Sequence, residues 1–355
     1  MNLRKLLFFS LGIVASIAVE AQNLSQHNWY FGNKGNAIRF NRATNKPFVV
    51  TNNAITVGTG GTAVATDPLT GDILFYTDGV NVYNANHQVM PNGSGLNANT
   101  GANQPVVLSS KPHDSTKFYI FTNTAHYPTV GSIYIDTVDM NQFGGSTFPS
   151  PPLGDVIAKN KAMAGLTGRS EGMIVIPTST KMDTLWLITH KSGSQDYAVT
   201  RIDKTRTFPT TVYTIASNVP PPGQVPISVA NFSYNKRLKK LAVSPQNPNA
   251  DALILNFDET TGALTWDRYI YNTGQPTTTG QSIYNIQWDN AGQYLYISRV
   301  GETGINADVF QYDYLNPGNT LVSVLKSPEY RSWGLQLAPD STIYHIYQTV
   351  AGGPY

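Results

Sequence analysis

Two residues of this 355-residue chain, Glu171 and His190, have the types and spacing of an acid and a base that could act together. They lie before and after two predicted strands, 173–176 and 184–188, so consecutive strands of one sheet would bring both side chains to one edge. Structural roles compete with catalysis: His190 could bond a neighbouring loop, and Glu171 could accept backbone N–H groups. The sequence offers no other candidate catalytic residue.

The remaining histidines do not predict a metal site. His87, His113, His126 and His345 occur singly, and no two have the spacing of paired metal ligands. Acidic residues such as Asp289 fall at turns, and none forms the Asp-x-Asp-x-Asp-Gly loop of a calcium hand. We therefore predict no cofactor and no metal, and leave open a structural calcium ion held by loop carbonyls.

Aromatic side chains offer a second kind of chemistry, the stacking of sugars. Trp29, Trp266, Trp288 and Trp333 are the candidates. Trp288 and Trp333 stand within strand motifs, which favours packing between sheets instead. No nucleophile elbow, phosphate-binding loop or dinucleotide fingerprint is present.

The N-terminus predicts export. Arg4 and Lys5 precede an apolar run over 6–19, and small residues before Gln22 suit a signal peptidase. We interpret 1–21 as a signal peptide, with an uncleaved anchor as the alternative. The mature chain, 22–355, contains no further apolar run of spanning length, so we expect an exported, extracellular or outer-surface protein that does not span the membrane.

The composition narrows the fold class and the partners. Only 13% of residues are charged and the net charge is +2, which gives no electrostatic footprint for nucleic acid. The chain has no cysteine, so no disulfide supports it. Its 30 glycines, 22 prolines and 20 tyrosines suit strands joined by tight turns, which predicts an all-β protein.

One sequence pattern recurs six times: a polar turn, a strand of apolar and aromatic residues, and a second strand. Its strands are predicted at 73–77, 80–83, 117–121, 132–135, 173–176, 184–188, 197–202, 229–232, 240–243, 252–257, 284–288, 294–297, 308–312, 333–337 and 343–346. The spacing between successive copies matches the length of a four-stranded propeller blade, as in WD40-like repeats. We predict a β-propeller of four-stranded blades, six of them visible and seven in the intact ring, with paired β-sandwiches as the alternative.

The two ends of the chain bear on how the ring closes. Segments 29–32 and 37–40 are predicted strands before the first full copy, and the sixth copy stops soon after its second strand. A propeller closes by pairing its terminal strands. We therefore expect one propeller domain over 22–355 that is truncated at its C-terminus, within a longer protein.

Several segments together resemble a known group of proteins. They are 29–32, 73–80, 83–93, 170–173, 187–190 and 334–340. In these segments the chain resembles the N-terminal, propeller-like region of large secreted Bacteroidetes proteins associated with gliding motility and type IX secretion. The resemblance implies display at the cell surface but supplies no chemistry. Where that family often has a Glu-Lys pair, this chain has Glu171-Gly172, which weakens any role carried over to this position.

The sequence thus favours an exported recognition or adhesion module that binds glycan or protein through propeller loops without catalysis. One alternative is a propeller-type hydrolase, lactonase or lyase that uses Glu171 and His190. Another is a structural component of a gliding or type IX secretion apparatus. The sequence leaves the oligomeric state open.

Overall fold

The computed structural model describes residues 24–30, 35–51, 60–178, 183–205, 207–215, 225–248, 250–270, 283–300, 308–316, 321–326 and 331–349. Every regular element in this part of the chain is a β-strand, and the strands form six antiparallel sheets. The first is β1 (Asn28–Tyr30), β2 (Ala37–Phe40) and β3 (Pro47–Val50). The second is β4 (Ala63–Thr66), β5 (Ile73–Thr77), β6 (Asn81–Asn84) and β7 (Val89–Ser94). The third has seven strands: β8 (Val106–Lys111), β9 (Asp114–Asn123), β10 (Gly131–Asp139), β11 (Asp155–Pro177), β12 (Leu185–Lys191), β13 (Asp196–Ile202) and β14 (Thr210–Thr214).

The remaining three sheets come from the C-terminal part of the chain. One is β15 (Val229–Asn235), β16 (Lys240–Pro245), β17 (Ala252–Phe257) and β18 (Leu264–Ile270). The next is β19 (Ile283–Trp288), β20 (Tyr294–Arg299), β21 (Asp308–Asp313) and β22 (Val322–Lys326). The last is β23 (Arg331–Leu337) with β24 (Ile343–Gln348).

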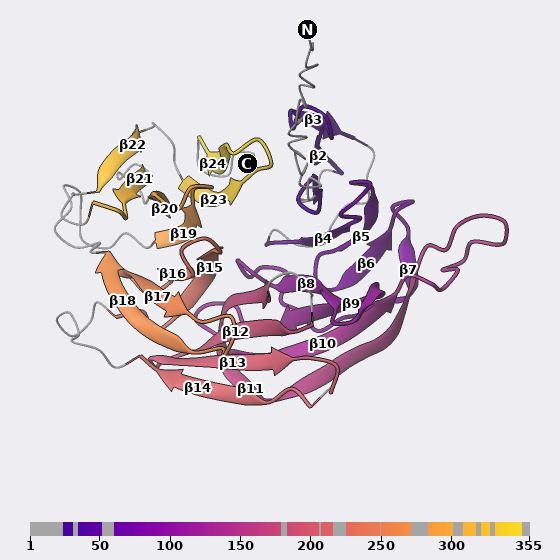
Figure 1. The fold of residues 1–355 in the computed structure, drawn as a ribbon, viewed down its shortest axis with the longest axis horizontal. Helices are drawn as coiled ribbons and strands as arrows, with labels where there is room; N and C mark the ends of the chain where they lie inside the picture. Colours follow the sequence, from indigo (N-terminus) through magenta and orange to yellow (C-terminus); the bar gives the residue numbers. More distant parts are fainter. Residues whose placement is uncertain are drawn as a thin grey trace, which may run out of the picture.

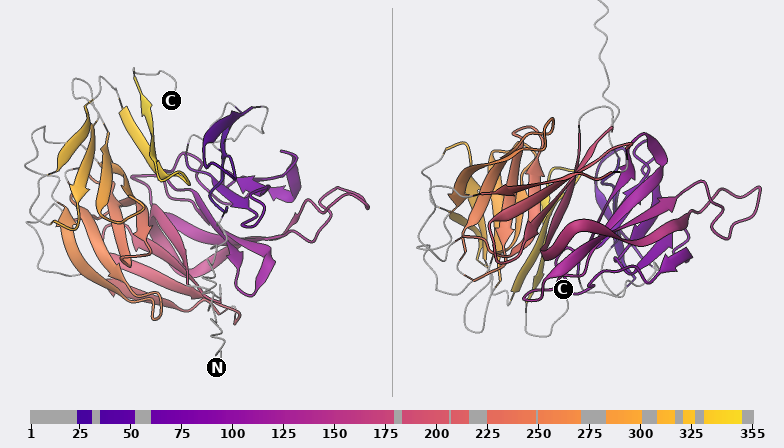
Figure 2. Two further views of the ribbon diagram at one scale, coloured as in Figure 1. Left: turned by 45° about the horizontal axis from the view of Figure 1, so that its top comes forward. Right: turned by 90° about the horizontal axis from the view of Figure 1, so that it is seen from below.

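The four larger sheets have a propeller-like arrangement around a common axis, with the two small sheets at the two ends of the series (Figure 1). Figure 2 shows the same sheets standing side by side. The first strand of each later sheet contacts its neighbours near the axis, as β15 does with β11 and β19. The predicted all-β class and propeller architecture are therefore confirmed.

Apolar side chains fill the spaces between neighbouring sheets. Trp186 and Ile188 of β12 pack in one cluster with Leu255 and Phe257 of β17. The opposite face of β17 belongs to the next cluster, through Ile254. Each fully buried side chain of this size contributes about 1.5–3 kcal/mol. Sheet-to-sheet packing thus holds together a fold that has no disulfide.

The seven-stranded sheet is built around the 23-residue strand β11. Its first part pairs with β10, from Asp155 to Arg169, and its last part pairs with β12, from Arg169 to Pro177. One apolar cluster joins Phe121 of β9 to Leu187 of β12. The sheet therefore bends along β11, so that its two halves pack against each other.

The predicted number of blades, six visible and seven in the intact ring, is not confirmed by the sheets. Four sheets have four or more strands, and β11 joins two predicted copies into one of them. The sequence predicted no strand between residues 136 and 172, because the first half of β11 lacks a clear alternation of apolar and polar residues. Its residues 157–159 are exposed, and Gly165 and Gly168 interrupt it with φ of +75° and +65°.

The turns predicted between paired strands are confirmed, and their chemistry is visible. Asp67 accepts the N–H groups of Leu69 and Thr70 at 2.8 and 3.0 Å. Asp258 likewise accepts the N–H of Thr260 at 2.8 Å. A short acidic side chain thus replaces backbone partners that a tight turn cannot supply.

The first and last sheets contact each other. The ring of Tyr344 in β24 lies 5.6 Å from that of Trp29 and 6.0 Å from that of Phe40. The side-chain amide of Asn45 also donates to the carbonyl of Pro339 at 3.2 Å. The predicted signal peptide, 1–21, lies outside the described residues. No helix in the described part of the chain has the length and hydropathy to cross a membrane.

Candidate functional site

Glu171 lies in β11 where the pairing with β12 shifts register, between Arg169 and Met173. Its side chain is 2% exposed. One carboxylate oxygen accepts the N–H of Asn103 at 2.6 Å, and the other accepts the N–H of Tyr127 at 2.7 Å. The carboxylate therefore fastens two separate loops to the strand.

Asn123, at the end of β9, reinforces this junction. Its amide donates to the carbonyls of Ser170 and Glu171 at 2.9 and 3.1 Å, while its oxygen accepts the N–H of Ala125 at 2.9 Å. Gly131 permits the close approach, because a Cβ there would lie 2.0 Å from the nitrogen of Ala125. The side chain of Asn123 thus bonds buried backbone groups instead of facing solvent.

His126 is the one exposed titratable side chain that contacts Glu171 among the described residues. Its Nδ1 lies 3.5 Å from Glu171 Oε1, and its side chain is 52% exposed. The sequence had treated His126 as an isolated histidine, because nothing in the spacing relates the loop after β9 to the middle of β11. A carboxylate beside an imidazole is an acid–base arrangement.

His190, at the end of β12, is fully buried. Its Nε2 donates to the carbonyl of Ser194 at 2.9 Å, so Nδ1 is the acceptor for the hydroxyl of Ser170 at 3.0 Å. Burial lowers the pKa of His190 to about 4, with Arg169 acting in the same direction. The imidazole is neutral near pH 7 and closes the turn between β12 and β13.

The structure does not assemble Glu171 and His190 as a pair. Within the described ranges, no hydrogen bond or ion pair connects the two side chains. Glu171 binds the loops at Asn103 and Tyr127, whereas His190 binds Ser170 and Ser194. The expected meeting of the two side chains fails because the adjacent residues Ser170 and Glu171 engage different segments.

The other histidines occupy separate environments. His87 lies 3.3 Å from the hydroxyl of Tyr76, and His345 lies 2.6 Å from the hydroxyl of Ser332. The described ranges contain no group of three or more His, Cys, Asp or Glu side chains that could hold a metal ion.

The tryptophans that the sequence singled out are mostly packed. Trp288 is 1% exposed, and Trp29 contacts Phe40 at a ring distance of 4.9 Å. Trp333 packs edge-on against Tyr284 at 4.8 Å. Trp266 is 39% exposed and is the candidate with the most accessible ring.

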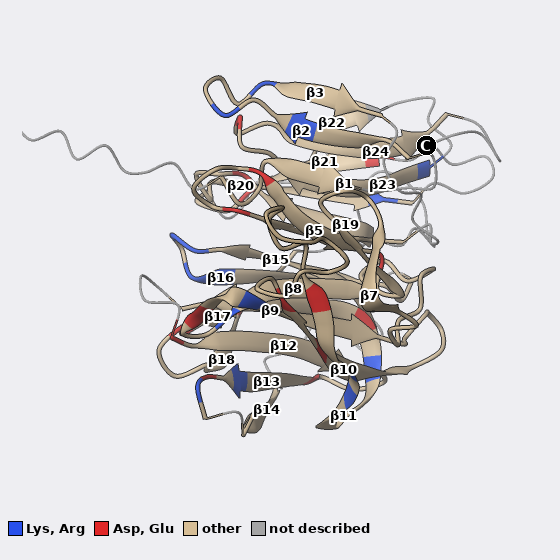
Figure 3. Cartoon of the chain, turned by 90° about the vertical axis from the view of Figure 1, so that its right-hand side faces the viewer, with Lys and Arg blue, Asp and Glu red and all other residues tan. Residues whose placement is uncertain are grey.

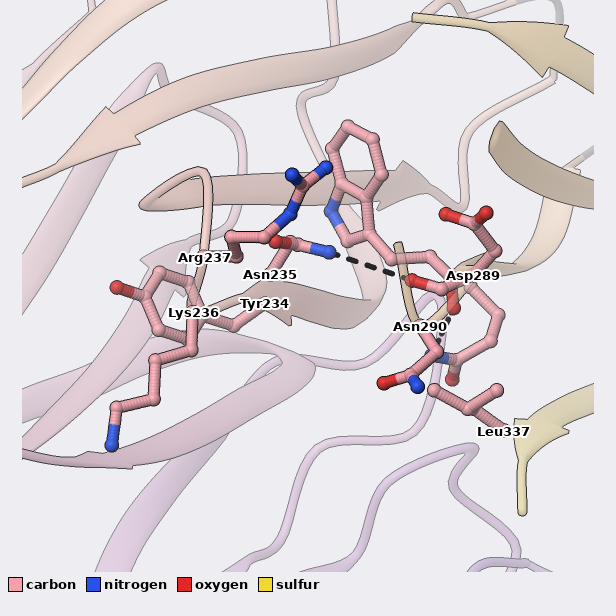
Figure 4. A pocket seen from close by; sticks show the side chains of 9 residues that line it. Tyr234, Asn235, Lys236, Arg237, Asp289, Asn290 and Leu337 are labelled. Atoms are coloured by element: carbon pink, nitrogen blue, oxygen red, sulfur yellow. Dashed lines mark hydrogen bonds between the residues drawn. The ribbon is translucent and has the colours of Figure 1, made fainter. Parts of the chain in front are cut away.

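A pocket of about 510 Å³ lies at the opposite end of β15 from Glu171. It opens between the turn that joins β15 to β16 and the turn that joins β19 to β20 (Figure 4). It is lined by Tyr234, Asn235, Lys236, Arg237, Gln287, Trp288, Asp289, Asn290 and Leu337. We call it the turn pocket.

Hydrogen bonds fix the walls of the turn pocket. The amide of Asn235 donates to the carbonyl of Asp289 at 3.4 Å and so links the two turns (Figure 4). Arg237 donates to the carbonyl of Ala291 in the second turn. Tyr234 donates to Glu259 at 2.7 Å, and burial together with this bond raises the pKa of the phenol.

The first turn carries a concentration of positive charge (Figure 3). Lys240 is neutralised by Asp267, with 2.8 Å between Nζ and Oδ1. Burial opposes charge on Lys240, but the bond to Asp267 prevails and raises its pKa. Lys236 and Arg237 are exposed and form no ion pair with any described residue. Sequence reasoning missed this site, although Lys236 and Asp289 fall at equivalent turns of consecutive copies.

Comparisons with known proteins identify the fold and no family. No family model matches the chain, and no curated protein matches it. The chain is similar to the β-propeller domain of Cps50 (Swd1) from Myceliophteria thermophila, with 11% identity and a TM-score of 0.50, over 89% of this chain and 88% of that one. It is also similar to a candidate 6-phosphogluconolactonase from Bacteroides uniformis, with 10% identity and a TM-score of 0.50, over 90% and 86%. Identities this low show the propeller fold alone.

Proposed function

We propose that this chain is a recognition or adhesion module, without catalytic activity, that binds a glycan or protein ligand through the turns at one end of its propeller. The observation that carries the proposal is the turn pocket, where Lys236 and Arg237 are exposed without acidic partners among the described residues. Exposed charge and amide groups around a concave surface are suited to holding a ligand in one orientation.

The state of the predicted catalytic pair supports the same proposal. The carboxylate of Glu171 is committed to two backbone N–H groups, and His190 is closed off from solvent. A general acid or base must come within hydrogen-bond reach of the substrate proton that it transfers. His190 would need the turn at Ser194 to open before it could do so.

We propose further that each half of the seven-stranded sheet is one blade, which with the other five sheets makes a seven-bladed ring. The cluster that joins Phe121 to Leu187 supports this, because it packs the two halves as neighbouring blades pack elsewhere. The contacts of Tyr344 with Trp29 and Phe40 support closure between the first and last sheets.

The proposed setting is the cell surface, as part of a larger exported protein of the Bacteroidetes gliding or type IX secretion group. Support comes from the signal-peptide pattern over 1–21 and from the resemblance described above. Fractionation of cells that express the full open reading frame tests the setting, and we expect the protein in the surface or medium fraction. Retention in the cytoplasm would contradict it.

A direct test of function presents the purified chain to a glycan array and to purified surface proteins, with parallel assays of ester, lactone and polysaccharide turnover. We expect saturable binding to at least one ligand and no turnover above that of a heat-treated sample. Catalytic turnover of one of these substrates, together with no binding to any glycan or protein tested, would contradict the proposal.

The contact between Glu171 and His126 keeps one alternative, a propeller-type hydrolase. In this function the half-exposed imidazole of His126 would act as base and the buried carboxylate would orient it. His126→Ala should then abolish turnover without changing stability. Turnover unaffected by this substitution would end the alternative.

A further inference from the structure

We infer that the turn pocket binds an acidic sugar, with Arg237 facing its carboxylate, Lys236 adding positive charge at the rim, and neighbouring polar side chains facing its hydroxyls. This inference names the ligand class of the recognition module and rests on the function proposed above. It draws on the charge, the polar groups and the size of the pocket.

The positive charge at the turn pocket is positioned but not neutralised. A guanidinium has five N–H donors in a fixed planar arrangement. Arg237 directs one of them to the carbonyl of Ala291, which anchors the group beside the pocket. Lys236 adds a second cation at the edge. An anchored arginine suits a carboxylate, which it can bind through two parallel hydrogen bonds.

Lys240, at the start of β16 just after this turn, is a cation whose charge is neutralised within the protein. Lys240 bonds Asp267 and lies 5.8 Å from the centroid of the Tyr314 ring. Its charge is therefore satisfied within the protein. Asp289 is the one acidic side chain among the described residues that line the pocket, whereas Arg237 lies across from it and Lys236 stands at the rim (Figure 4). The balance favours a ligand with negative charge.

The polar groups opposite the cations suit hydroxyls. Asp289 accepts the N–H of Tyr294 at 3.1 Å, which fixes its carboxylate. The amide of Asn290 donates to the hydroxyl of Ser341 at 3.3 Å, and that of Gln287 donates to the carbonyl of Trp288 at 3.1 Å. These bonds orient side chains whose oxygens are acceptors for ligand hydroxyl groups.

The size and walls of the turn pocket suit a small, rigid ligand. Its volume of about 510 Å³ falls in the range of roughly 300–1,000 Å³ found for small-molecule sites. Trp288 lines it and is 1% exposed, and its indole N–H has no hydrogen-bond partner among the described residues. Tyr234 is held in place by Glu259. An indole in the lining also gives the site a fluorescence signal.

The pocket favours a sugar over an acidic peptide or a nucleic acid. Asp289, Asn290 and Gln287 lie together in one pocket, an arrangement that matches the adjacent hydroxyls of a sugar ring. A peptide backbone would need a row of aligned donors and acceptors. A nucleic acid would need a broad basic surface, which a net charge of +2 does not provide.

The test uses isothermal titration with trigalacturonate, neutral galactotriose and a tri-glutamate peptide, supported by tryptophan fluorescence. We expect trigalacturonate to bind at least about tenfold more tightly than either competitor, and added salt to weaken the binding. The Lys236→Gln/Arg237→Gln variant should lose about tenfold or more in affinity. Lys191→Gln, an exposed lysine at the opposite end of β15, is the matched control and should change affinity less than about twofold.

Each outcome has one meaning. Equal binding of galactotriose, tighter binding of the peptide, or unchanged binding by the double variant overturns the inference. The comparison of ligands uses the unmodified protein, so it decides the matter even if the double variant fails to fold. A different ligand on the glycan array, bound equally by the double variant, would end this inference and leave the proposed recognition function intact. Turnover with no ligand at all would end both.

Discussion

Glu171 and Arg237 lie at opposite ends of the same inner part of the propeller. Gly172 packs against Val229, where β15 begins, and Arg237 follows the end of β15 in the turn to β16. A strand of this length spans roughly 20 Å at about 3.3 Å per residue. The polar side chains at the two ends have different fates. At one end they are buried and bonded to backbone, and at the other they are exposed and charged.

This difference in burial and bonding indicates a structural role for the polar groups at the Glu171 end and a binding role for those at the Arg237 end. A buried carboxylate with two N–H partners stabilises the loops that it joins, and removing it costs folding free energy. An exposed cation with no acidic partner contributes little to stability, so a ligand gives a physical reason for its position. We therefore expect substitutions at the first end to change stability and those at the second to change binding.

The largest effect is expected for Glu171→Ala. It removes a buried carboxylate and leaves the part-buried N–H groups of Asn103 and Tyr127 without their acceptor, and each unsatisfied group costs about 1–3 kcal/mol where water does not replace the lost bond. We expect the free energy of unfolding to fall by about 4 kcal/mol in urea titrations. Arg237→Gln is the comparison and should change it by less than about 0.5 kcal/mol. Similar losses for both variants would erase the distinction between the two ends.

The next effect concerns pH. Unfolded histidine takes up a proton near its ordinary pKa of 6.5, whereas the buried His190 does so only near pKa 4. The unfolded state therefore binds more protons in this window, and the free energy of unfolding falls as the pH is lowered from about 6.5 to 4, by about 3 kcal/mol. His345, whose pKa burial also lowers to about 4, acts in the same direction. Asp136, whose pKa burial raises to about 6, acts in the opposite one.

His190→Gln isolates the contribution of this histidine. Glutamine can keep the bond to the carbonyl of Ser194 but loses the one from Ser170, so we expect a cost of about 1 kcal/mol near pH 7. Its loss of stability on acidification should be smaller than that of the unmodified protein. Urea titrations at several pH values measure both. Parallel pH profiles would show that His190 does not set the acid sensitivity.

An effect smaller than the pH dependence of about 3 kcal/mol is expected for Gly172→Ala. A Cβ at this position would lie 2.7 Å from Val229 Cγ1, so the substitution overpacks the contact between β11 and β15. We expect a loss of about 2 kcal/mol. Thermal unfolding measures it, and Val229→Ala in the same chain should recover part of the loss. An unchanged midpoint would mean that this contact is looser than the structure shows.

The smallest expected effect compares two lysines near one turn, Lys236 within it and Lys240 at the start of β16. Lys240→Gln breaks the half-buried pair with Asp267 and should cost about 1 kcal/mol, whereas Lys236→Gln should change the free energy of unfolding by less than about 0.5 kcal/mol. Urea titrations of both variants make the comparison. A larger cost for Lys236→Gln would show that this side chain has a structural partner.

Much of the fold could be predicted from the sequence because many of its buried strands are short runs of apolar and aromatic residues. Segments 73–77 and 252–257 are dense in apolar and aromatic residues, and they coincide with β5 and β17. The stretch over 155–168 could not be recognised. It is largely exposed, carries Lys159 and Lys161, and owes its strand conformation to pairing with β10.

The candidate site was less predictable for a related reason. His190 was correctly placed near the end of a strand, whereas Glu171, expected before a strand, lies within β11. The partners of Glu171 also come from loops that are distant in the sequence. The approach of Arg237 to Ala291 depends on how two sheets stack, and stacking leaves no local pattern in the sequence. The recurring turns in the sequence indicate where ligand-binding side chains can lie, but they do not show which turns lie next to each other in the folded chain.

Hydrogen–deuterium exchange with and without trigalacturonate tests most directly which end of the propeller binds. Peptides that cover 234–240 and 287–292 should gain protection, and those that cover 97–104, 124–131 and 192–195 should not change. Protection confined to the second group would place the ligand beside Glu171 and His126, and would contradict the assignment of recognition to the turn pocket.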